Sequence, residues 1–177
     1  MPKAELHLHL DGCLRPATAI ELAAQYGVAA PSTFFGMFDA LNAERVVLVN
    51  ADALARITTE LVEDKAADRV RYMEIKWAPA FHLECGLTLD EVIDTVAGAA
   101  ASAAARCGVV VRLTVVALRS ADPAATVEVA HAAVAHRTSG VTGFDLAGFE
   151  AAHPDPTVHA AAFEVARAGG LGLTVHT

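Results

Sequence analysis

Two histidines near the start of the chain have the residue type and the spacing of a metal site. His7 and His9 are one residue apart in an apolar run, residues 4–9, whose length and composition predict a β-strand. Side chains two positions apart on a strand point to the same face, so we expect the two imidazoles to lie side by side. Neutral imidazole is a good zinc ligand, and catalytic zinc sites use about three protein ligands. The pair therefore predicts two ligands of a metal centre.

A third histidine, His176, ends another apolar run, residues 171–176. In a closed barrel of parallel strands the first and fifth strands lie across from each other, so a central ion could take ligands from both. Asp11, two residues beyond His9, could be a ligand, an acceptor for a substrate hydroxyl, or a turn residue. The other histidines fall on predicted helices or loops, and we expect them to be solvated or structural: His82, His131, His136, His153 and His159.

The composition limits the class of partner. The chain has 177 residues, 54% of them hydrophobic, and a formal net charge of -8, which argues against a nucleic-acid or anionic-membrane surface and favours small molecules. Three cysteines without a C-x-x-C pair predict a reducing, cytoplasmic setting. The apolar stretch 96–105 is too short to span a membrane. Because an isolated buried charge is costly, we expect Glu74 to form a structural ion pair with Lys76 or Arg119.

Apolar runs of strand length alternate with segments of helix length, and this alternation predicts a parallel sheet covered by helices. The clearest helix signal is at residues 88–106, where Thr88 is a candidate N-cap, Glu91 its capping-box partner and Gly108 the stop. An open doubly wound sheet and a (β/α)₈ barrel both fit the alternation, but polar residues at strand tips favour the barrel. The predicted strands are 4–9, 70–79, 109–118, 141–148 and 171–176, and the predicted helices are 16–26, 34–41, 52–68, 88–106, 123–137 and 157–168.

Five segments, in order along the chain, strongly resemble motifs of the adenosine deaminase family within the amidohydrolase superfamily. The opening segment reads PKAELHLHLDG, the second VRYMEIKWAP, the fourth GFDLAG, and the last LTVH resembles the start of the family's T-x-H-A-G-E motif. This resemblance implies an α/β fold of the (β/α)₈ TIM-barrel type, with about five of the eight βα units in a single domain over residues 1–177. The matching segments are residues 2–12, 70–79, 117–119, 143–148 and 173–176.

The resemblance also implies an activity, which is the zinc-dependent hydrolytic deamination of adenosine or a related 6-aminopurine nucleoside. In the family, hydroxide generated at Zn²⁺ attacks C6 of the purine and ammonia leaves. An aspartate contacts the ribose side of the substrate, a glycine N–H faces the purine ring, and two phenylalanines form the aromatic pair of a gating helix. The matching metal residues are His7, His9 and His176, and the matching substrate-binding residues are Asp11, Gly148, Phe34 and Phe38.

Two departures from the family pattern shape the expectation for this chain. The family's catalytic glutamate lies three residues beyond the match to His176, so the resemblance assigns no catalytic residue within residues 1–177. We therefore expect the isolated chain to be incompetent, with open barrel edges that a complementing chain or a second copy could cover. Phe149 stands where the family usually has an aspartate, which could favour a bulkier purine nucleoside. The alternatives are a truncated, inactive remnant that binds metal or a partner chain, and a deaminase for adenine or an aminofutalosine-type nucleoside.

Overall fold

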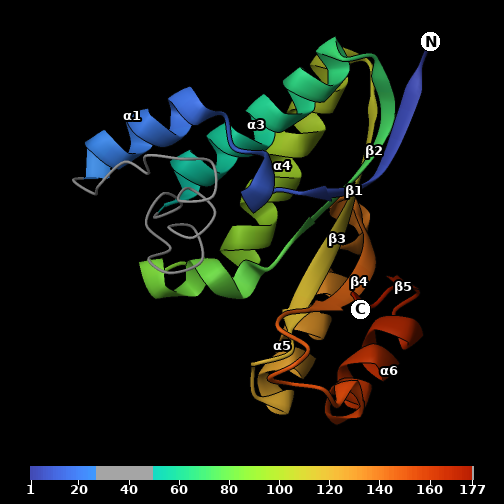
Figure 1. The fold of residues 1–177 in the computed structure, drawn as a ribbon. Helices are drawn as coiled ribbons and strands as arrows, with labels where there is room; N and C mark the ends of the chain where they lie inside the picture. Colours follow the sequence, from blue (N-terminus) through green and yellow to red (C-terminus); the bar gives the residue numbers. More distant parts are fainter. Residues whose placement is uncertain (27–49, 177) are drawn as a thin grey trace.

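The computed structural model describes residues 1–26 and 50–176, which contain a parallel sheet of five strands in the order β1-β2-β3-β4-β5. Each strand pairs with its neighbour in sequence, as a barrel wall requires (Figure 1). The strands are β1 (Lys3–His9), β2 (Val70–Trp77), β3 (Val110–Leu118), β4 (Val141–Ala147) and β5 (Gly172–Leu173).

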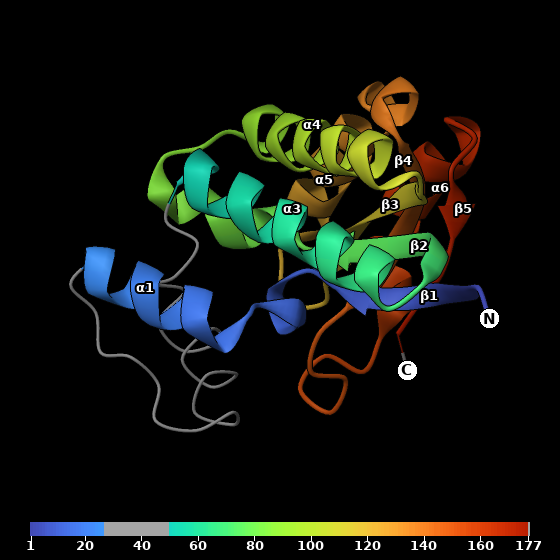
Figure 2. The same ribbon diagram turned by 90° about the horizontal axis from the view of Figure 1, so that it is seen from above.

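Helices connect successive strands and pack on one face of the sheet. Figure 2 shows α3 and α4 side by side over that face, and α5 and α6 also pack against each other. Among the described residues, no helix combines the length and the apolar character needed to cross a membrane. The α-helices are α1 (Pro16–Tyr26), α3 (Ala51–Ala67), α4 (Leu89–Cys107), α5 (Pro123–Ala135) and α6 (Ala160–Ala168), and the 3₁₀ turns are η1 (Asp11–Cys13), η2 (Pro79–Cys85), η3 (Arg137–Ser139) and η4 (Pro156–His159).

The two faces of the sheet have different chemistry. On β2, Met73 and Ile75 point toward the helices and are fully buried. The alternate positions Tyr72, Glu74 and Lys76 lie on the other face. In the register of the sheet, Lys76 pairs with Thr114 of β3 and Thr114 pairs with Gly143 of β4, so these residues share that face. Asp145, two positions after Gly143, lies on it as well. This inner face carries Glu74, Lys76, Thr114 and Asp145, and the candidate site lies on this face.

Local signals in the sequence account for most of the observed elements. Helix α4 begins after Thr88, whose side chain accepts the backbone N–H of Glu91, while the Glu91 carboxylate accepts the backbone N–H of Thr88. Gly108 ends the helix in the left-handed conformation. The capping box and the glycine stop predicted from sequence are therefore confirmed.

Three expected features differ from the structure. The strand expected at 171–176 is assigned only at Gly172–Leu173, although the N–H groups of Thr174 and His176 still donate to β4 carbonyls. The helix expected at 157–168 begins as the 3₁₀ turn η4, in which Asp155 accepts the N–H of Thr157, and continues as α6 from Ala160. The ion pair expected for Glu74 was wrong: Glu74 accepts the hydroxyl of Tyr72. The helix expected at 34–41, with Phe34 and Phe38, lies outside the described residues.

We expect Thr88→Ala to lower the free energy of unfolding by about 1 kcal/mol, because it removes the capping acceptor of α4 and leaves helix N–H groups unpaired. Urea denaturation of the chain measures the change. Ser102→Ala, at an exposed position inside the same helix, is the control and should be neutral to slightly stabilising, because alanine is the better helix former. Equal effects of the two substitutions would contradict a role for the capping box.

Candidate metal centre and adjoining pocket

An irregularity in β1 brings the H-x-H motif to the inner face of the sheet. In the β1–β2 register, Glu5 pairs with Met73 and Leu8 with Ile75, so three steps on β1 match two steps on β2. This bulge lets both Glu5 and Leu8 face the helices, where Glu5 pairs with Lys65 at 2.9 Å and Leu8 is buried. Bulges next to active sites commonly redirect side chains in this way.

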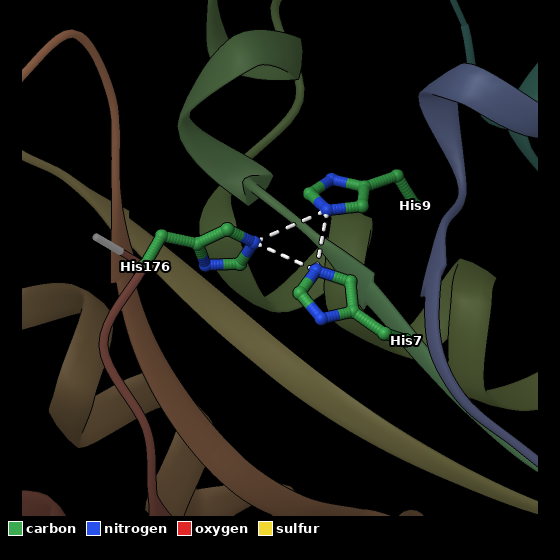
Figure 3. Close-up of side chains that lie close together, drawn as sticks. All are labelled: His7, His9 and His176. Atoms are coloured by element: carbon green, nitrogen blue, oxygen red, sulfur yellow. Dashed lines mark hydrogen bonds between the residues drawn. The ribbon is translucent and has the colours of Figure 1, made fainter.

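The three histidines predicted as metal ligands converge on one point. Figure 3 shows the rings of His7 and His9 from β1 and His176 from beyond β5 turned toward one another. Their Nε2 atoms are 2.9 Å apart for His7 and His9, 2.9 Å for His7 and His176, and 3.2 Å for His9 and His176. Among the described residues, this is the one group of three or more His, Cys, Asp or Glu side chains with ligand atoms close enough to hold a metal ion.

The donor set and its spacing fit a zinc ion. Tetrahedral zinc with Zn–N bonds of 2.0–2.1 Å needs ligand nitrogens about 3.3 Å apart, close to the separations observed here. The pKa of both His7 and His9 lies below 6.5, because burial disfavours the charged ring and the charges of Lys76 and His176 add to the effect. Both rings are therefore neutral at pH 7, which is the form that binds a metal.

A buried ion pair stands behind His176. The Nζ atom of Lys76 lies 2.6 Å from Oδ2 of Asp145, and both side chains are almost fully buried. The same carboxylate oxygen lies 2.9 Å from Nδ1 of His176, a close contact that does not have the geometry of a regular hydrogen bond. A carboxylate at Nδ1 favours the tautomer in which Nε2 carries the lone pair. Asp145 therefore orients His176 toward the other two histidines.

The pKa of the Asp145 carboxyl reflects this pairing. Burial acts to raise the pKa, but the hydrogen bond and the charge of Lys76, with a further contribution from His176, lower it below its ordinary 3.8. Asp145 is therefore a carboxylate at neutral pH, and its negative charge favours a cation at the histidine cluster.

A pocket of about 420 Å³ adjoins the histidine cluster, within the size range of small-molecule sites. His9 and His176 form part of its wall, so a molecule in the pocket would contact a metal held by the three histidines. Its lining mixes apolar side chains with two carboxylates. The lining residues are His9, Asp11, Trp77, Ala78, Phe81, Val116, Leu118, Ala147, Gly148, Glu150 and His176.

Asp11 lies in this pocket with an unusual protonation equilibrium. Its side chain is 27% exposed, yet its apolar surroundings raise its pKa from 3.8 to about 6. Nε2 of the buried His82 is 3.8 Å from Oδ1 of Asp11, beyond hydrogen-bond distance. Asp11 Oδ1 has no hydrogen-bond partner in the described part of the chain. Asp11 lines the pocket, so a molecule bound there would contact its side chain.

Gly148 lines the pocket just after the end of β4, at a position where a side chain is disfavoured. Its φ of +133° lies in a region that side chains disfavour, and an added Cβ would come within 3.3 Å of the Cβ of Arg119. The absence of a side chain leaves the backbone of Gly148 accessible to a molecule in the pocket.

Comparison with known proteins decides the family. The sequence profile of the Adenosine deaminase family matches residues 2–177. The chain belongs to this family. It is 41% identical to the adenosine deaminase of Mycobacterium tuberculosis strain H37Rv, over 99% of the chain and 53% of that protein. It is 42% identical to the adenosine deaminase of Mycolicibacterium vanbaalenii, over 99% of the chain and 54% of that protein. The chain thus spans about half the length of the curated relatives it matches.

Solved structures of family relatives have the same arrangement. An amidohydrolase from Burkholderia ambifaria with bound zinc superimposes with a TM-score of 0.88 at 29% identity, covering all of this chain and 52% of that one. An adenine deaminase from Arthrobacter aurescens and the N6-methyl-AMP deaminase from Arabidopsis thaliana each give a TM-score of 0.85 at 26% identity, covering 99% of this chain and 57% of theirs. These neighbours confirm the barrel prediction: the five strands form part of a TIM-barrel fold.

Five of the seven site residues predicted from the family resemblance lie in the described part of the chain. The structure brings His7, His9 and His176 together, and it places Asp11 and Gly148 in the adjoining pocket. Phe34 and Phe38 lie outside the described residues.

Sequence reasoning missed the contributions of Lys76 and Arg119. A lysine among the apolar residues of a buried strand was the available signal for the first. The second carried no local signal, because its contacts are to carbonyl groups distant in sequence.

We expect Asp11→Asn to stabilise the metal-free chain at pH 8 but not at pH 3. A carboxyl whose folded pKa is raised favours folding while it is protonated, and this contribution is lost as pH rises from about 4 through 6. The variant should gain about 2 kcal/mol relative to the parent over that range, measured by urea denaturation at both pH values.

Asp155→Asn is the control for the sign of the Asp11 effect. The hydroxyl and backbone N–H of Thr157 lower the pKa of Asp155. Its contribution to stability is therefore present above about pH 4 and lost at lower pH. The Asp155→Asn variant should therefore become less stable relative to the parent as pH rises. A common pH trend for both variants would rule out our account of Asp11.

We expect Gly148→Ala to cost about 1–3 kcal/mol, because alanine would adopt a disfavoured backbone conformation and crowd Arg119. Thermal and urea unfolding measure the loss. The control is Gly98→Ala in helix α4, where an added Cβ meets nothing within 4 Å. That change should stabilise the chain by about 0.5–1 kcal/mol. A neutral Gly148→Ala variant would show that the position tolerates a side chain.

Proposed function

We propose that the protein carrying this chain is a zinc-dependent deaminase of 6-aminopurines, with adenosine as the first candidate substrate. The observation that carries the proposal is the convergence of three histidine Nε2 atoms within 3.2 Å of one another, beside a pocket of about 420 Å³. The family match and the zinc in the Burkholderia ambifaria structure support it.

The three histidines and the ion pair behind His176 have separate roles in this proposal. His7, His9 and His176 hold the ion, and Asp145 with Lys76 fixes the orientation of His176. A zinc ion bound there would lower the pKa of a water molecule and so supply a nucleophile at neutral pH. Proton transfer is assigned to none of the described residues.

The pocket supplies binding and orientation. The carboxyl group of Asp11, which lines the pocket, would accept a hydrogen bond from a sugar hydroxyl, and the exposed backbone of Gly148 can donate its N–H to the purine ring. The apolar side chains of Trp77, Val116 and Leu118 exclude water from the face of a bound base. These roles place the reacting carbon beside the histidine cluster.

We expect the chain to bind one zinc ion, and we expect alanine at His7, His9 or His176 to weaken binding by more than about 100-fold. Loss of a direct ligand should exceed the 10- to 100-fold cost of changing an outer contact. Competition with a chelating dye measures the affinity. His131→Ala, at an exposed position on α5, is the control and should bind as the parent does.

The activity is tested on the native gene product by release of ammonia from adenosine and adenine, and of methylamine from N6-methyl-AMP. The last two compounds are included because deaminases of adenine and of N6-methyl-AMP are structural neighbours. Turnover of adenosine supports the proposal, and turnover of adenine alone supports the second candidate. Binding of zinc without turnover of any 6-aminopurine would indicate a remnant that keeps the metal site. Trp77, the single tryptophan of residues 1–177, lines the pocket and can report purine binding to this chain by fluorescence.

A further inference from the structure

Arg119 is a buried cation whose side chain ends between two parts of the site. It follows β3, and its side chain is only 2% exposed. One terminal nitrogen donates to the carbonyl of His176 at 2.9 Å, and the other donates to the carbonyl of His153 at 3.3 Å. The guanidinium thus links the segment that carries a metal ligand to the loop that follows β4.

The carboxylate nearest to Arg119 is too distant to explain why the charge is buried. Glu150 lies 3.7 Å away, and its side chain is half exposed. Removing a cation from water costs several kcal/mol unless close partners compensate. The guanidinium instead has carbonyl dipoles as its nearest acceptors, in a planar fork that a lysine cannot reproduce. The geometry therefore requires an arginine that contacts two separate segments at once.

The backbone of Arg119 is itself held firmly. Its N–H donates to the carbonyl of Ala147 on β4 at 2.8 Å, and its carbonyl accepts the Nε2–H of His159 at 3.3 Å. His159 is buried and is fixed in turn by the hydroxyl of Thr126 at 3.2 Å from its Nδ1. Because the backbone of Arg119 is fixed in this way, its guanidinium can hold in place the groups that it contacts.

The parts that Arg119 contacts both belong to the site. Beyond Leu173, the N–H groups of Thr174 and His176 donate to β4. Within the described residues, the carbonyl of His176 is held by Arg119. On the other side, Arg119 packs against Gly148 and lies near Glu150, and both residues line the pocket.

We propose that Arg119 is a positioning residue that holds the metal ligand His176 and the pocket rim at Gly148 and Glu150 in one fixed arrangement. This inference rests on the proposed zinc site. Asp145 orients the ring of His176 from its Nδ1 side, while Arg119 fixes the backbone from which the ring projects. Without Arg119, the Nε2 atom of His176 would lose its fixed distance to the other two histidines.

The test uses Arg119→Lys and Arg119→Met in the full chain, with zinc affinity and the visible spectrum of bound Co²⁺ as readouts. We expect Arg119→Met to weaken zinc binding by about 10- to 100-fold, as other changes around metal ligands do. Arg119→Lys should give a smaller but measurable loss, because one ammonium cannot reach both carbonyls in the same geometry. Both variants should alter the Co²⁺ absorption bands, which report ligand geometry and which a general loss of stability would leave unchanged.

Arg137→Met is the matched control, because Arg137 donates to the carbonyl of Gly169 at 3.4 Å, away from the histidine cluster. It should leave zinc affinity and the Co²⁺ spectrum as in the parent. An Arg119→Lys variant with parental affinity and spectrum would overturn the inference, even if Arg119→Met fails to fold. Failure of the parent chain itself to bind zinc would instead contradict the three-histidine zinc site on which the proposed function rests.

Discussion

The ion pair between Lys76 and Asp145 is the interaction on which the arrangement of the inner face depends. It connects β2 to β4 across β3, and Lys76 also donates to the hydroxyl of Thr174 at 3.2 Å. Burying two charges costs several kcal/mol for each ion, so the pair is stable only because its contacts are short and numerous. Gly143 allows the close packing around it, since a Cβ there would lie 2.6 Å from the Thr114 hydroxyl. The pair thus links β2 and β4 to the segment that carries His176.

Features of the fold that depend on neighbouring residues could be predicted from sequence. Helix α1 has the bounds expected from its apolar spacing, and α4 has the capping box and glycine stop that its ends indicate. The parallel sheet followed from continuous apolar runs separated by helices. The end of β5 was predicted less well, because a strand assignment depends on its partner. There β4 supplies hydrogen bonds without a full ladder.

The candidate site was predicted as far as side-chain type and strand-end position allow. The histidines were found because their donor chemistry is specific and because they end strands. Lys76, in contrast, was paired with the wrong carboxylate, since the choice between Glu74 and Asp145 depends on which strands are neighbours in space. The bulge in β1 was not predicted either, because a register shift between Glu5 and Leu8 is visible only against Met73 and Ile75 of β2. Such features depend on contacts between residues distant in sequence.

The strand order has a consequence for biosynthesis. Because every strand pairs with the one made just before it, each βα unit can dock as it leaves the ribosome, starting from the N-terminus. His7 and His9 are therefore in place early, but His176 lies 169 positions after His7. At 5–20 residues per second this interval is on the order of 10–30 s. During that time the nascent chain can offer an incoming ion two imidazoles, and tight metal capture must wait for the fifth strand.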